Sequence, residues 1–423
     1  MRVLIVSATD GRYGADRAAY RLYRALSAQP SVDAGMLVQQ RWGDDPSVLA
    51  PSSLVGRAIG VARPHLDRAM LPLYRDRGEA LFSPALWPAT TARQIRSFAP
   101  EIVNLHWVAG GMLPFESLAA LGAPIVWTFH DAWAFTGGCH YPGVCRGYRE
   151  RCGSCPQLGS TSPIDLSRLG ILRRERAYRG LDWCAVTPSR WLASIAASSP
   201  LLRGVSIETI PNSLDLDRFR PIARRRAREW LGLPAERPLL LFGAVNATGD
   251  PRKGYRYLAG ALELLERERL DASPVVVVFG GARKPPGRWH GFETHHLGRL
   301  ADETTLALAY AAADCLVVPS VEDNLPNTIL ESLACGTPII AFDAGGIPEM
   351  IEDGRTGHLV SGGDVAGLAQ ALQQVIAGGL AGDAVRQRCR TFAESEYAPT
   401  RQAQRYLSLF KERTQRDAAR GGR

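Results

Sequence analysis

One short stretch of the chain, residues 319–338, combines side chains that could bind a phosphorylated ligand bearing hydroxyl groups. It has the pattern of a strand end, an acidic turn and a short helix, with Pro326 near the helix start and Gly336 just past its end. The N–H groups and the dipole at a helix start favour a phosphate or another polar oxygen. Glu331 falls on the helix face of Asn327, where a carboxylate could hold sugar hydroxyls. The alternative is a capped helix with Glu331 in solvent.

The turn and helix resemble the Glu-x7-Glu signature of the retaining, nucleotide-sugar-dependent glycosyltransferases of family 4, which have the GT-B fold. In that family the first acid contacts the donor sugar and the second the nucleotide ribose, which implies Asp323 and Glu331 here. Asp323 departs from the pattern because its side chain is shorter than the usual Glu, and Glu322 beside it could substitute. The resemblance implies three further donor-binding residues: Asn324, Leu325 and Asn327.

A cationic loop, Arg252-Lys253-Gly254, follows the strand expected at residues 238–245. A fixed cation beside a glycine at a helix start is suited to neutralising a diphosphate leaving group. Lys253 matches the phosphate-binding lysine of the resembled family. The usual arginine of the strand-end loop is missing, with Ala244 near its place, and Arg252 could compensate.

The N-terminal half begins with a strand, a glycine loop and a helix, an arrangement that can bind an anion. A simple tight turn is the alternative. In the resembled family this loop faces the donor phosphates across the cleft, which implies that Gly14 and Ala15 are donor-binding residues.

Two later strands end in His106-Trp107 and in His130, at the edge of an open α/β sheet where ligands bind. A lone histidine at a strand end is more often structural, but two of them indicate a ligand site. The family has a histidine at the position of His130 that contacts the donor sugar. We expect His106 and Trp107 to face the acceptor.

Four of the eight cysteines fall within seventeen residues, spaced Cys-x5-Cys-x6-Cys-x2-Cys. This glycine-rich segment has too few apolar side chains to form a stable core of its own, and a structural zinc ion would stabilise its fold. The expected ligands are Cys139, Cys145, Cys152 and Cys155. Free thiols and a reversible disulfide are the alternatives, and a catalytic metal is not expected because four thiolates leave no open position. A Cys-rich insertion, here residues 137–157, is known in a bacterial polysaccharide subgroup of the resembled family.

The length and composition of the chain restrict the classes of function that it can have. At 423 residues the chain is long enough for two domains, and no apolar run approaches the roughly 20 residues of a membrane span. The short first apolar run leads directly into a loop, which predicts a cytoplasmic protein without a signal peptide. The formal net charge of +8 favours anionic partners, but no nucleic-acid-binding module is present, so nucleic acid is not expected as a partner.

Residues 54–82 intersperse arginines with apolar residues. Such a segment can lie on an anionic membrane surface or bind a lipid-linked acceptor, which would make the protein peripheral on the inner face of the plasma membrane. The alternative, which we favour, is an ordinary pair of surface helices broken by Pro64 and Pro72.

The predicted fold class is α/β, with two Rossmann-like domains facing a central cleft as in GT-B enzymes. Residues 1–206 form the acceptor-side domain and residues 207–390 the nucleotide-sugar-binding domain. Residues 391–423 form a helix that crosses back to the first domain, followed by a basic tail.

The resemblance implies transfer of a hexose from a nucleoside diphosphate sugar, of UDP or GDP type, to a saccharide hydroxyl with retention of configuration. The implied acceptor is lipid-linked, in bacterial surface polysaccharide synthesis. His130, Lys253 and Asp323 are the expected catalytic residues, and no cofactor is required for catalysis. The rival functions are a nucleotide-sugar epimerase or hydrolase of the same fold and a non-catalytic nucleotide-sugar-binding protein.

Overall fold

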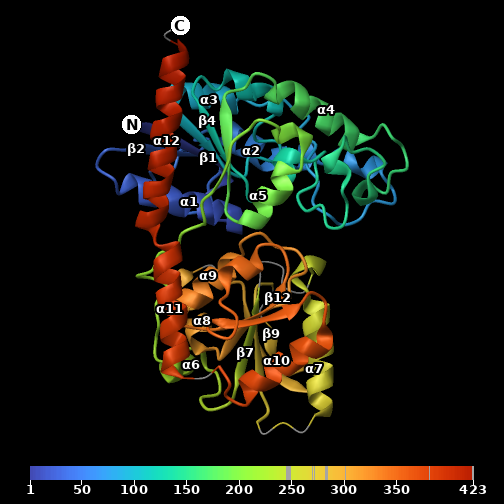
Figure 1. The fold of residues 1–423 in the computed structure, drawn as a ribbon, viewed down its shortest axis with the longest axis vertical. Coiled ribbons are helices and arrows are strands. Elements are labelled where there is room, and N and C mark those ends of the chain that lie inside the picture. Colours follow the sequence, from blue (N-terminus) through green and yellow to red (C-terminus); the bar gives the residue numbers. More distant parts are fainter. Residues whose placement is uncertain are drawn as a thin grey trace. The chain divides into compact units, whose positions relative to one another are not determined.

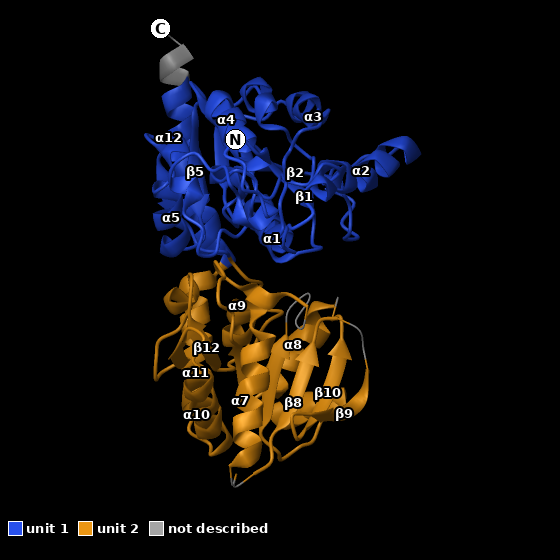
Figure 2. Cartoon of the chain, turned by 90° about the vertical axis from the view of Figure 1, so that its right-hand side faces the viewer, with its two compact units in different colours: residues 1–212, 399–423 blue, residues 213–398 orange. Residues whose placement is uncertain are grey.

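The computed structural model divides the chain into two compact units, coloured separately in Figure 2. Unit 1 comprises Met1–Asn212 and Pro399–Arg423, and unit 2 comprises Ser213–Ala398. The structure describes residues 1–243, 249–268, 270, 272–281, 284–300, 302–380 and 382–421. The sequence-based boundaries were 206/207 and 390/391, so each observed division falls a few residues later.

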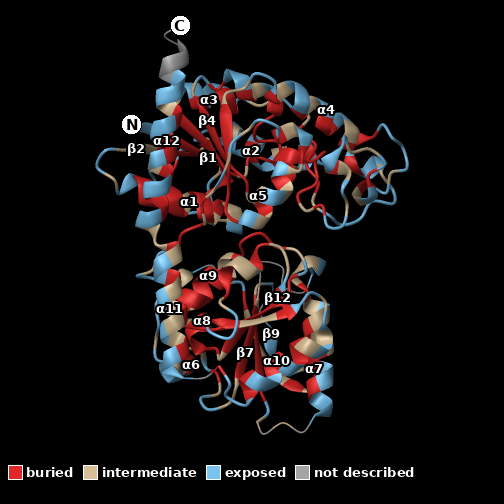
Figure 3. Cartoon of the chain, viewed as in Figure 1, coloured by how far each residue is buried: buried red, intermediate tan, exposed pale blue. Residues whose placement is uncertain are grey.

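Unit 1 is built on a six-stranded, fully parallel sheet (Figure 1). In the order of the sheet the strands are β2 (Asp33–Gln40), β1 (Arg2–Thr9), β3 (Ile102–Leu105), β4 (Ile125–Thr128), β5 (Trp183–Thr187) and β6 (Ile207–Thr209). The central strands are nearly continuous apolar runs because helices cover both of their faces, and Figure 3 shows them buried.

The helices of unit 1 are α1 (Gly14–Ser27), α2 (Leu54–Asp67), α3 (Thr91–Phe98), α4 (Leu166–Tyr178), α5 (Arg190–Ala197) and α12 (Pro399–Gly421). Short 3-10 turns span Leu71–Leu73, Phe115–Ala120, Trp133–Phe135, Gly147–Arg149, Pro156–Leu158 and Pro200–Leu202. The C-terminal helix α12 packs against α1, and its Tyr406 and Phe410 join the core formed by β1.

The expected break at Pro64 is wrong, because α2 continues through this residue to Asp67. A proline has no N–H, so the Gly60 carbonyl one turn earlier loses its usual helical partner. The amides of Gln39 (3.2 Å) and Gln40 (2.7 Å) on β2 donate to that carbonyl instead. The helix therefore tolerates the proline because the neighbouring strand satisfies the freed carbonyl.

Unit 2 has a seven-stranded sheet that is parallel except at one edge. In the order of the sheet the strands are β13 (Gly357–Ser361), β12 (Ile339–Asp343), β11 (Cys315–Val318), β7 (Leu239–Gly243), β8 (Val275–Phe279), β10 (Phe292–Gly298) and β9 (Lys284–Trp289). The edge strand β9 is antiparallel to β10. Two units with largely parallel sheets confirm the predicted α/β class.

The helices of unit 2 are α6 (Arg224–Leu231), α7 (Tyr255–Arg267), α8 (Glu303–Ala312), α9 (Asn327–Ala334), α10 (Val365–Ile376) and α11 (Asp383–Tyr397). Two 3-10 turns span Pro251–Lys253 and Ile347–Met350. Within the described residues, no helix is long and apolar enough to cross a bilayer.

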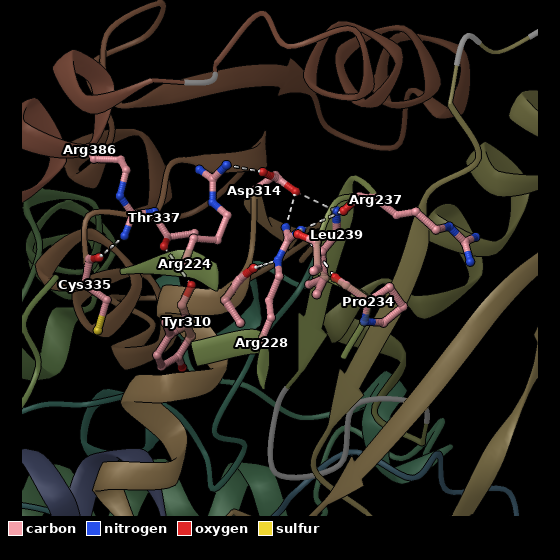
Figure 4. Close-up of polar contacts among 12 residues, drawn as sticks. Arg224, Arg228, Pro234, Arg237, Leu239, Tyr310, Asp314, Cys335, Thr337 and Arg386 are labelled. Atoms are coloured by element: carbon pink, nitrogen blue, oxygen red, sulfur yellow. Dashed lines mark hydrogen bonds and ion pairs between the residues drawn. The ribbon is translucent and has the colours of Figure 1, made fainter. Parts of the chain in front are cut away.

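The amino ends of β7 and β11 are held by a partly buried ionic cluster, drawn in Figure 4. Asp314 accepts from the guanidinium groups of Arg228 (2.7 Å) and Arg224 (2.6 Å) and from the backbone N–H of Leu239 (2.7 Å). Arg228 also donates to the carbonyl of Ala312 at 2.9 Å. Because each charge is paired and hydrogen-bonded, the cluster fixes the two strands whose opposite, carboxyl ends carry the loops described next.

Candidate active site

Lys253 and Asp323 contact each other at the carboxyl ends of two neighbouring strands of unit 2. Lys253 follows β7, Asp323 follows β11, and the Lys253 ammonium donates to Asp323 Oδ2 at 2.6 Å. Their side chains are 24% and 10% exposed, so the pair is largely shielded from water but not fully buried. The structure thus joins two of the three predicted catalytic residues.

The two loops are tied together by their backbones. The N–H of Val321 donates to the Arg252 carbonyl at 2.9 Å. Gly254 has φ +72°, and a Cβ there would stand 1.7 Å from the Pro319 carbonyl oxygen. Only glycine fits at this position, so the approach of the Lys253 loop to the Asp323 loop depends on it.

Asp323 is fixed by the neighbouring turn as well as by Lys253. Its Oδ1 accepts from the Asn324 N–H (3.1 Å), and its carbonyl accepts from the Gly346 N–H (3.0 Å). Gly345, in the left-handed region with φ +63°, passes so close that a Cβ would stand 1.9 Å from the Asp323 carbonyl oxygen. Three loops therefore determine where the Asp323 carboxylate points.

Glu331 lies in the middle of α9, and its side chain is buried at 2% exposure. Its Oε2 accepts from the hydroxyl of Tyr310, a fully buried residue of α8, at 2.9 Å. The Tyr310 carbonyl in turn accepts from Thr337 Oγ1 at 2.7 Å, a contact visible in Figure 4. The alternative that left Glu331 in solvent is therefore wrong, because α8 covers the residue.

The remaining predicted donor-binding residues of unit 2 lie around this pair. Asn324 and Leu325 are buried, whereas Glu322 and Asn327 are partly exposed. Arg252 donates to Asp250 Oδ2 at 2.6 Å, so its charge is balanced within its own loop. Ala244, the position of the missing family arginine, lies outside the described residues. The role of Arg252 as a substitute stays a prediction.

In unit 1 the predicted anion-binding loop leads into α1, which begins at Gly14. Gly14 is exposed and Ala15 partly exposed, so the helix start lies at the surface. Asp16 lies inside the first turn, where it accepts from Ser7 (3.0 Å) and Thr9 (2.5 Å), and burial raises its pKa to about 6. This carboxylate organises the loop from within, and phosphate binding by Gly14 and Ala15 stays a prediction.

His106 and His130, at the carboxyl ends of β3 and β4, stack on each other with His106 Nδ1 2.9 Å from His130 Nε2. Asn104 Nδ2 donates to the Val126 carbonyl (2.9 Å), which identifies Oδ1 as the other atom of the amide. Because this oxygen can only accept, His106 Nε2 carries the hydrogen and donates to Asn104 Oδ1 (3.0 Å). A neutral His106 then accepts at Nδ1 from His130 Nε2–H, which leaves His130 Nδ1 unprotonated. Burial lowers the pKa of His130 to about 4 and that of His106 well below its usual value. The pair is therefore neutral, and His130 Nδ1 is a hydrogen-bond acceptor.

Sequence reasoning missed the buried network that lies behind this pair. Asp131 Oδ2 accepts from His140 Nδ1 (2.8 Å) and from the indole N–H of Trp107 (3.0 Å). His140 Nε2 lies 3.0 Å from Ser83 Oγ. His140 lowers the pKa of Asp131 against the effect of burial, so the carboxylate stays charged. Trp107, expected to face the acceptor, is thus anchored through its indole nitrogen to Asp131.

Comparison with known proteins decides the family. Residues 237–378, which include Lys253, Asp323 and Glu331, match the model of the glycosyl transferases group 1. Over 391 residues the chain is 33% identical to D-inositol 3-phosphate glycosyltransferase of Mycobacterium tuberculosis, covering 84% of this chain and 70% of that protein. The chain belongs to the group 1 glycosyltransferase family.

Two further likenesses fit this assignment. A match to D-inositol 3-phosphate glycosyltransferase 2 of Catenulispora acidiphila is 36% identical over 179 residues, covering 39% of this chain and 41% of that relative, less than half its length. The HepE protein of Anabaena, solved in complex with UDP and glucose, has the same fold with a TM-score of 0.64 at 14% identity, covering 97% of this chain and all of that one. This group 1 glycosyltransferase is therefore an enzyme with a GT-B fold.

Proposed function

We propose that this glycosyltransferase moves a hexose from a UDP-sugar to a hydroxyl of a saccharide acceptor, with retention of anomeric configuration. The contact of Lys253 with Asp323 at the start of α9 carries the proposal. It combines a cation for a diphosphate, a carboxylate for sugar hydroxyls and a helix start that favours phosphate oxygens. Glu331, one turn further along α9, is the proposed partner of the ribose hydroxyls.

In the proposed reaction the bond from the anomeric carbon to the diphosphate oxygen breaks, and a bond from that carbon to the acceptor oxygen forms on the same face of the sugar. Lys253 and the N–H groups at the start of α9 stabilise the charge that develops on the diphosphate. The acceptor proton moves to the departing diphosphate oxygen. Asp323 orients the sugar, no side chain acts as a nucleophile, and catalysis requires no metal.

We assign the neutral pair His106–His130 to sugar hydroxyls. The tautomer argued above makes His130 Nδ1 an acceptor, which suits a hydroxyl donor. Asn104 and His106 act as positioning residues, because they determine which His130 nitrogen carries the proton. Trp107 is the proposed acceptor-side residue.

The choice of UDP and hexose is supported by HepE, which was solved with UDP and glucose. Purified enzyme would be incubated with UDP-glucose and GDP-mannose, each with saccharide acceptors or with inositol phosphate, while nucleotide release is measured. Release that depends on a saccharide, with a product whose anomeric configuration by NMR matches the donor, supports the proposal. Release without any acceptor indicates a hydrolase, and transfer only to inositol phosphate overturns the acceptor assignment.

We further propose that unit 1 docks on an anionic bilayer through α2, as expected for an enzyme with a lipid-linked acceptor in surface polysaccharide synthesis. The side of α2 that packs on β2 carries Gly60, whose Cβ would stand 2.7 Å from the Gln39 carbonyl oxygen. The outer side is apolar and exposed. The exposed fractions are 78% for Leu54, 70% for Val55, 49% for Ile59, 58% for Val61 and 47% for Leu66. This is the reverse of an ordinary surface helix, which buries its apolar stripe.

Charge complementarity supports an anionic bilayer as the proposed occupant of this apolar face. Exposed arginines lie on and just after α2, at Arg57, Arg68, Arg75 and Arg77. Exposed apolar side chains with exposed arginines in the same segment fit the boundary between acyl chains and anionic headgroups. We favoured an ordinary surface helix from the sequence, and the exposed stripe reverses that preference.

Co-sedimentation with phosphatidylglycerol–phosphatidylcholine vesicles tests the docking proposal. We expect binding that falls with added salt and is lost in Val55→Ser/Ile59→Ser, but is kept in Leu169→Ser, which removes an exposed apolar side chain from α4. Equal binding by both variants would refute the proposal. So would self-association of the wild type that the double substitution abolishes, because the face would then be an interface between copies.

A further inference from the structure

The cysteine-rich segment of unit 1 folds around one small cavity. All four clustered cysteines, Cys139, Cys145, Cys152 and Cys155, line it. The cavity holds about 20 Å³, enough for one water-sized body but too small for an organic ligand. Its lining is otherwise mostly apolar, so a water molecule would find few hydrogen-bond partners there.

The backbone around the cavity is arranged to support negative charge on sulfur. The N–H of Gly147 donates to Cys145 Sγ at 3.4 Å. Burial raises the pKa of Cys152 to about 11 and also raises that of Cys155, and the backbone of Gly137 at Cys152 and of Leu158 and Gln157 at Cys155 opposes part of this rise. Such donors stabilise a thiolate more than a neutral thiol. The Gly147 N–H at Cys145 Sγ is therefore the kind of backbone partner that a metal-bound thiolate has.

Arg174 supplies an independent sign that negative charge belongs here. This residue of α4 is fully buried against the rings of Phe115 and Trp133, and among the described residues its Nε and Nη2 have no hydrogen-bond partner. Glu116 interacts electrostatically with Arg174, but its ion pair is with Arg173, at 2.7 Å. A buried cation without a counter-charge is strongly unfavourable.

Burial lowers the pKa of Arg174 to about 10, and Tyr178 and the clustered cysteines Cys139 and Cys152 oppose this effect. The hydroxyl of Tyr148, a buried residue that lines the cavity, has no partner among the described residues either. Neutral thiols satisfy neither group, because they carry no charge and are weak acceptors. Thiolates carry the negative charge that Arg174 lacks and are stronger acceptors than thiols.

We propose that Cys139, Cys145, Cys152 and Cys155 bind one structural zinc ion and that Arg174 is its buried counter-charge. Four thiols each lose a proton on binding, so zinc with four thiolates carries a net charge of −2 beside the guanidinium. A set of four soft sulfur ligands selects zinc over calcium or magnesium. In the described part of the chain no three His, Cys, Asp or Glu side chains are yet arranged to hold a metal, so the thiols must draw together as the ion enters.

Zinc at this position would also hold part of the candidate active site. Cys139 immediately precedes His140, whose carbonyl accepts from the Ala132 N–H (2.9 Å) and whose ring binds Asp131. A fixed Cys139 would therefore hold the segment that follows His130. The zinc is structural in this account, since four thiolates leave no position for a substrate.

The full-length chain, purified with a thiol reductant and without chelator, would be assayed for metal by mass spectrometry. We expect one zinc per chain in the wild type and in Cys184→Ser, a buried cysteine of β5 outside the cluster. Cys145→Ser and Cys155→Ser should lose the zinc. Since a variant could fail to fold, the metal-free wild type would also be titrated with Co²⁺, which should give the absorption of tetrahedral thiolate coordination.

The role of Arg174 has its own test. Competition with a chelator should show zinc affinity reduced about 10- to 100-fold in Arg174→Met, as for other residues just outside a metal's ligands. Arg174→Lys should restore part of the affinity, and Arg173→Met, next along α4, should not change it. Wild-type protein that takes up neither zinc nor cobalt, or that has a disulfide among these four cysteines under reducing conditions, would overturn the proposal.

Discussion

The contact between Lys253 and Asp323 predicts that stability and ligand binding can be separated by mutation. Lys253→Met removes the ammonium from the Asp323 carboxylate, in a residue only 7% exposed, and leaves it the hydrogen bond from the Asn324 N–H. Breaking a fully buried pair costs about 3–5 kcal/mol, and breaking a surface pair about 0–1 kcal/mol. With the Lys253 side chain 24% exposed, we expect about 2 kcal/mol, or roughly 4–8 °C in the Tm of unit 2.

Lys253→Met/Asp323→Asn should recover most of this loss, because the buried carboxylate is removed together with its partner. Binding of UDP should behave differently. Hydrogen bonds to a charged group contribute about 1.5–3 kcal/mol, so loss of the Lys253 ammonium should weaken UDP binding roughly 10- to 100-fold in the single and in the double variant.

Thermal unfolding of the ligand-free proteins and calorimetric titration with UDP would measure the two effects side by side. Lys284→Met, at an exposed lysine of β9, is the control and should change neither quantity. A double variant that regains wild-type UDP affinity would refute the reasoning. Lys253 would then serve only to neutralise Asp323.

Three further predictions follow from other contacts. Tyr310→Phe removes the hydroxyl that donates to Glu331 and should lower the free energy of unfolding by about 1.5–3 kcal/mol, measured by denaturant titration. It should also weaken UDP binding. An unchanged midpoint of the denaturant transition would contradict the prediction. His130, with its pKa lowered from 6.5 to about 4, stabilises the fold fully above pH 6.5 and loses this contribution as pH falls toward 4. The stability advantage of wild type over His130→Gln should therefore shrink by about 2 kcal/mol between pH 7 and pH 5, and a constant difference would refute the assignment. Gly254→Ala should destabilise by about 1–3 kcal/mol more than Gly232→Ala, because both glycines have positive φ but only Gly254 is crowded; equal losses would show that the loop can relax.

Local patterns in the sequence predicted the α/β class and the short helix near Glu331. Buried parallel strands are continuous apolar runs, and helix ends carry proline and glycine, so the pattern near Pro326 and Gly336 placed α9 within a residue. Lys253 and Asp323 were identified separately, from two motifs. That they touch depends on the pairing of β7 with β11, which no local pattern reveals.

The partners of these residues could not be predicted, because they come from distant elements. Tyr310 covers Glu331 only because α8 packs beside α9, and its sequence surroundings are those of any buried helix. The persistence of α2 through Pro64 depended on two glutamines of β2 that satisfy a freed carbonyl. Polar groups buried by tertiary packing are thus the part of the site that sequence reasoning misses.

Arg174 is a second kind of omission. Among many arginines, nothing in the sequence distinguishes the one that is fully buried next to the clustered cysteines. The cysteine spacing indicated a metal site. That a buried guanidinium, of Arg174, lies beside it without a counter-charge among the described residues could be seen only in the structure.

We propose that the start of α9 and the Lys253 loop hold the nucleotide of the donor. Isothermal titration of the full-length protein with UDP, GDP, ADP and dTDP, repeated with Glu331→Gln, tests it most directly. Glu394→Gln, at an exposed carboxylate of α11 in the same unit, is the matched control. We expect UDP to bind the wild type and Glu394→Gln with equal affinity, and Glu331→Gln to lose most of this affinity. Equal binding of UDP by Glu331→Gln and the wild type, or no binding of any nucleotide, would contradict it.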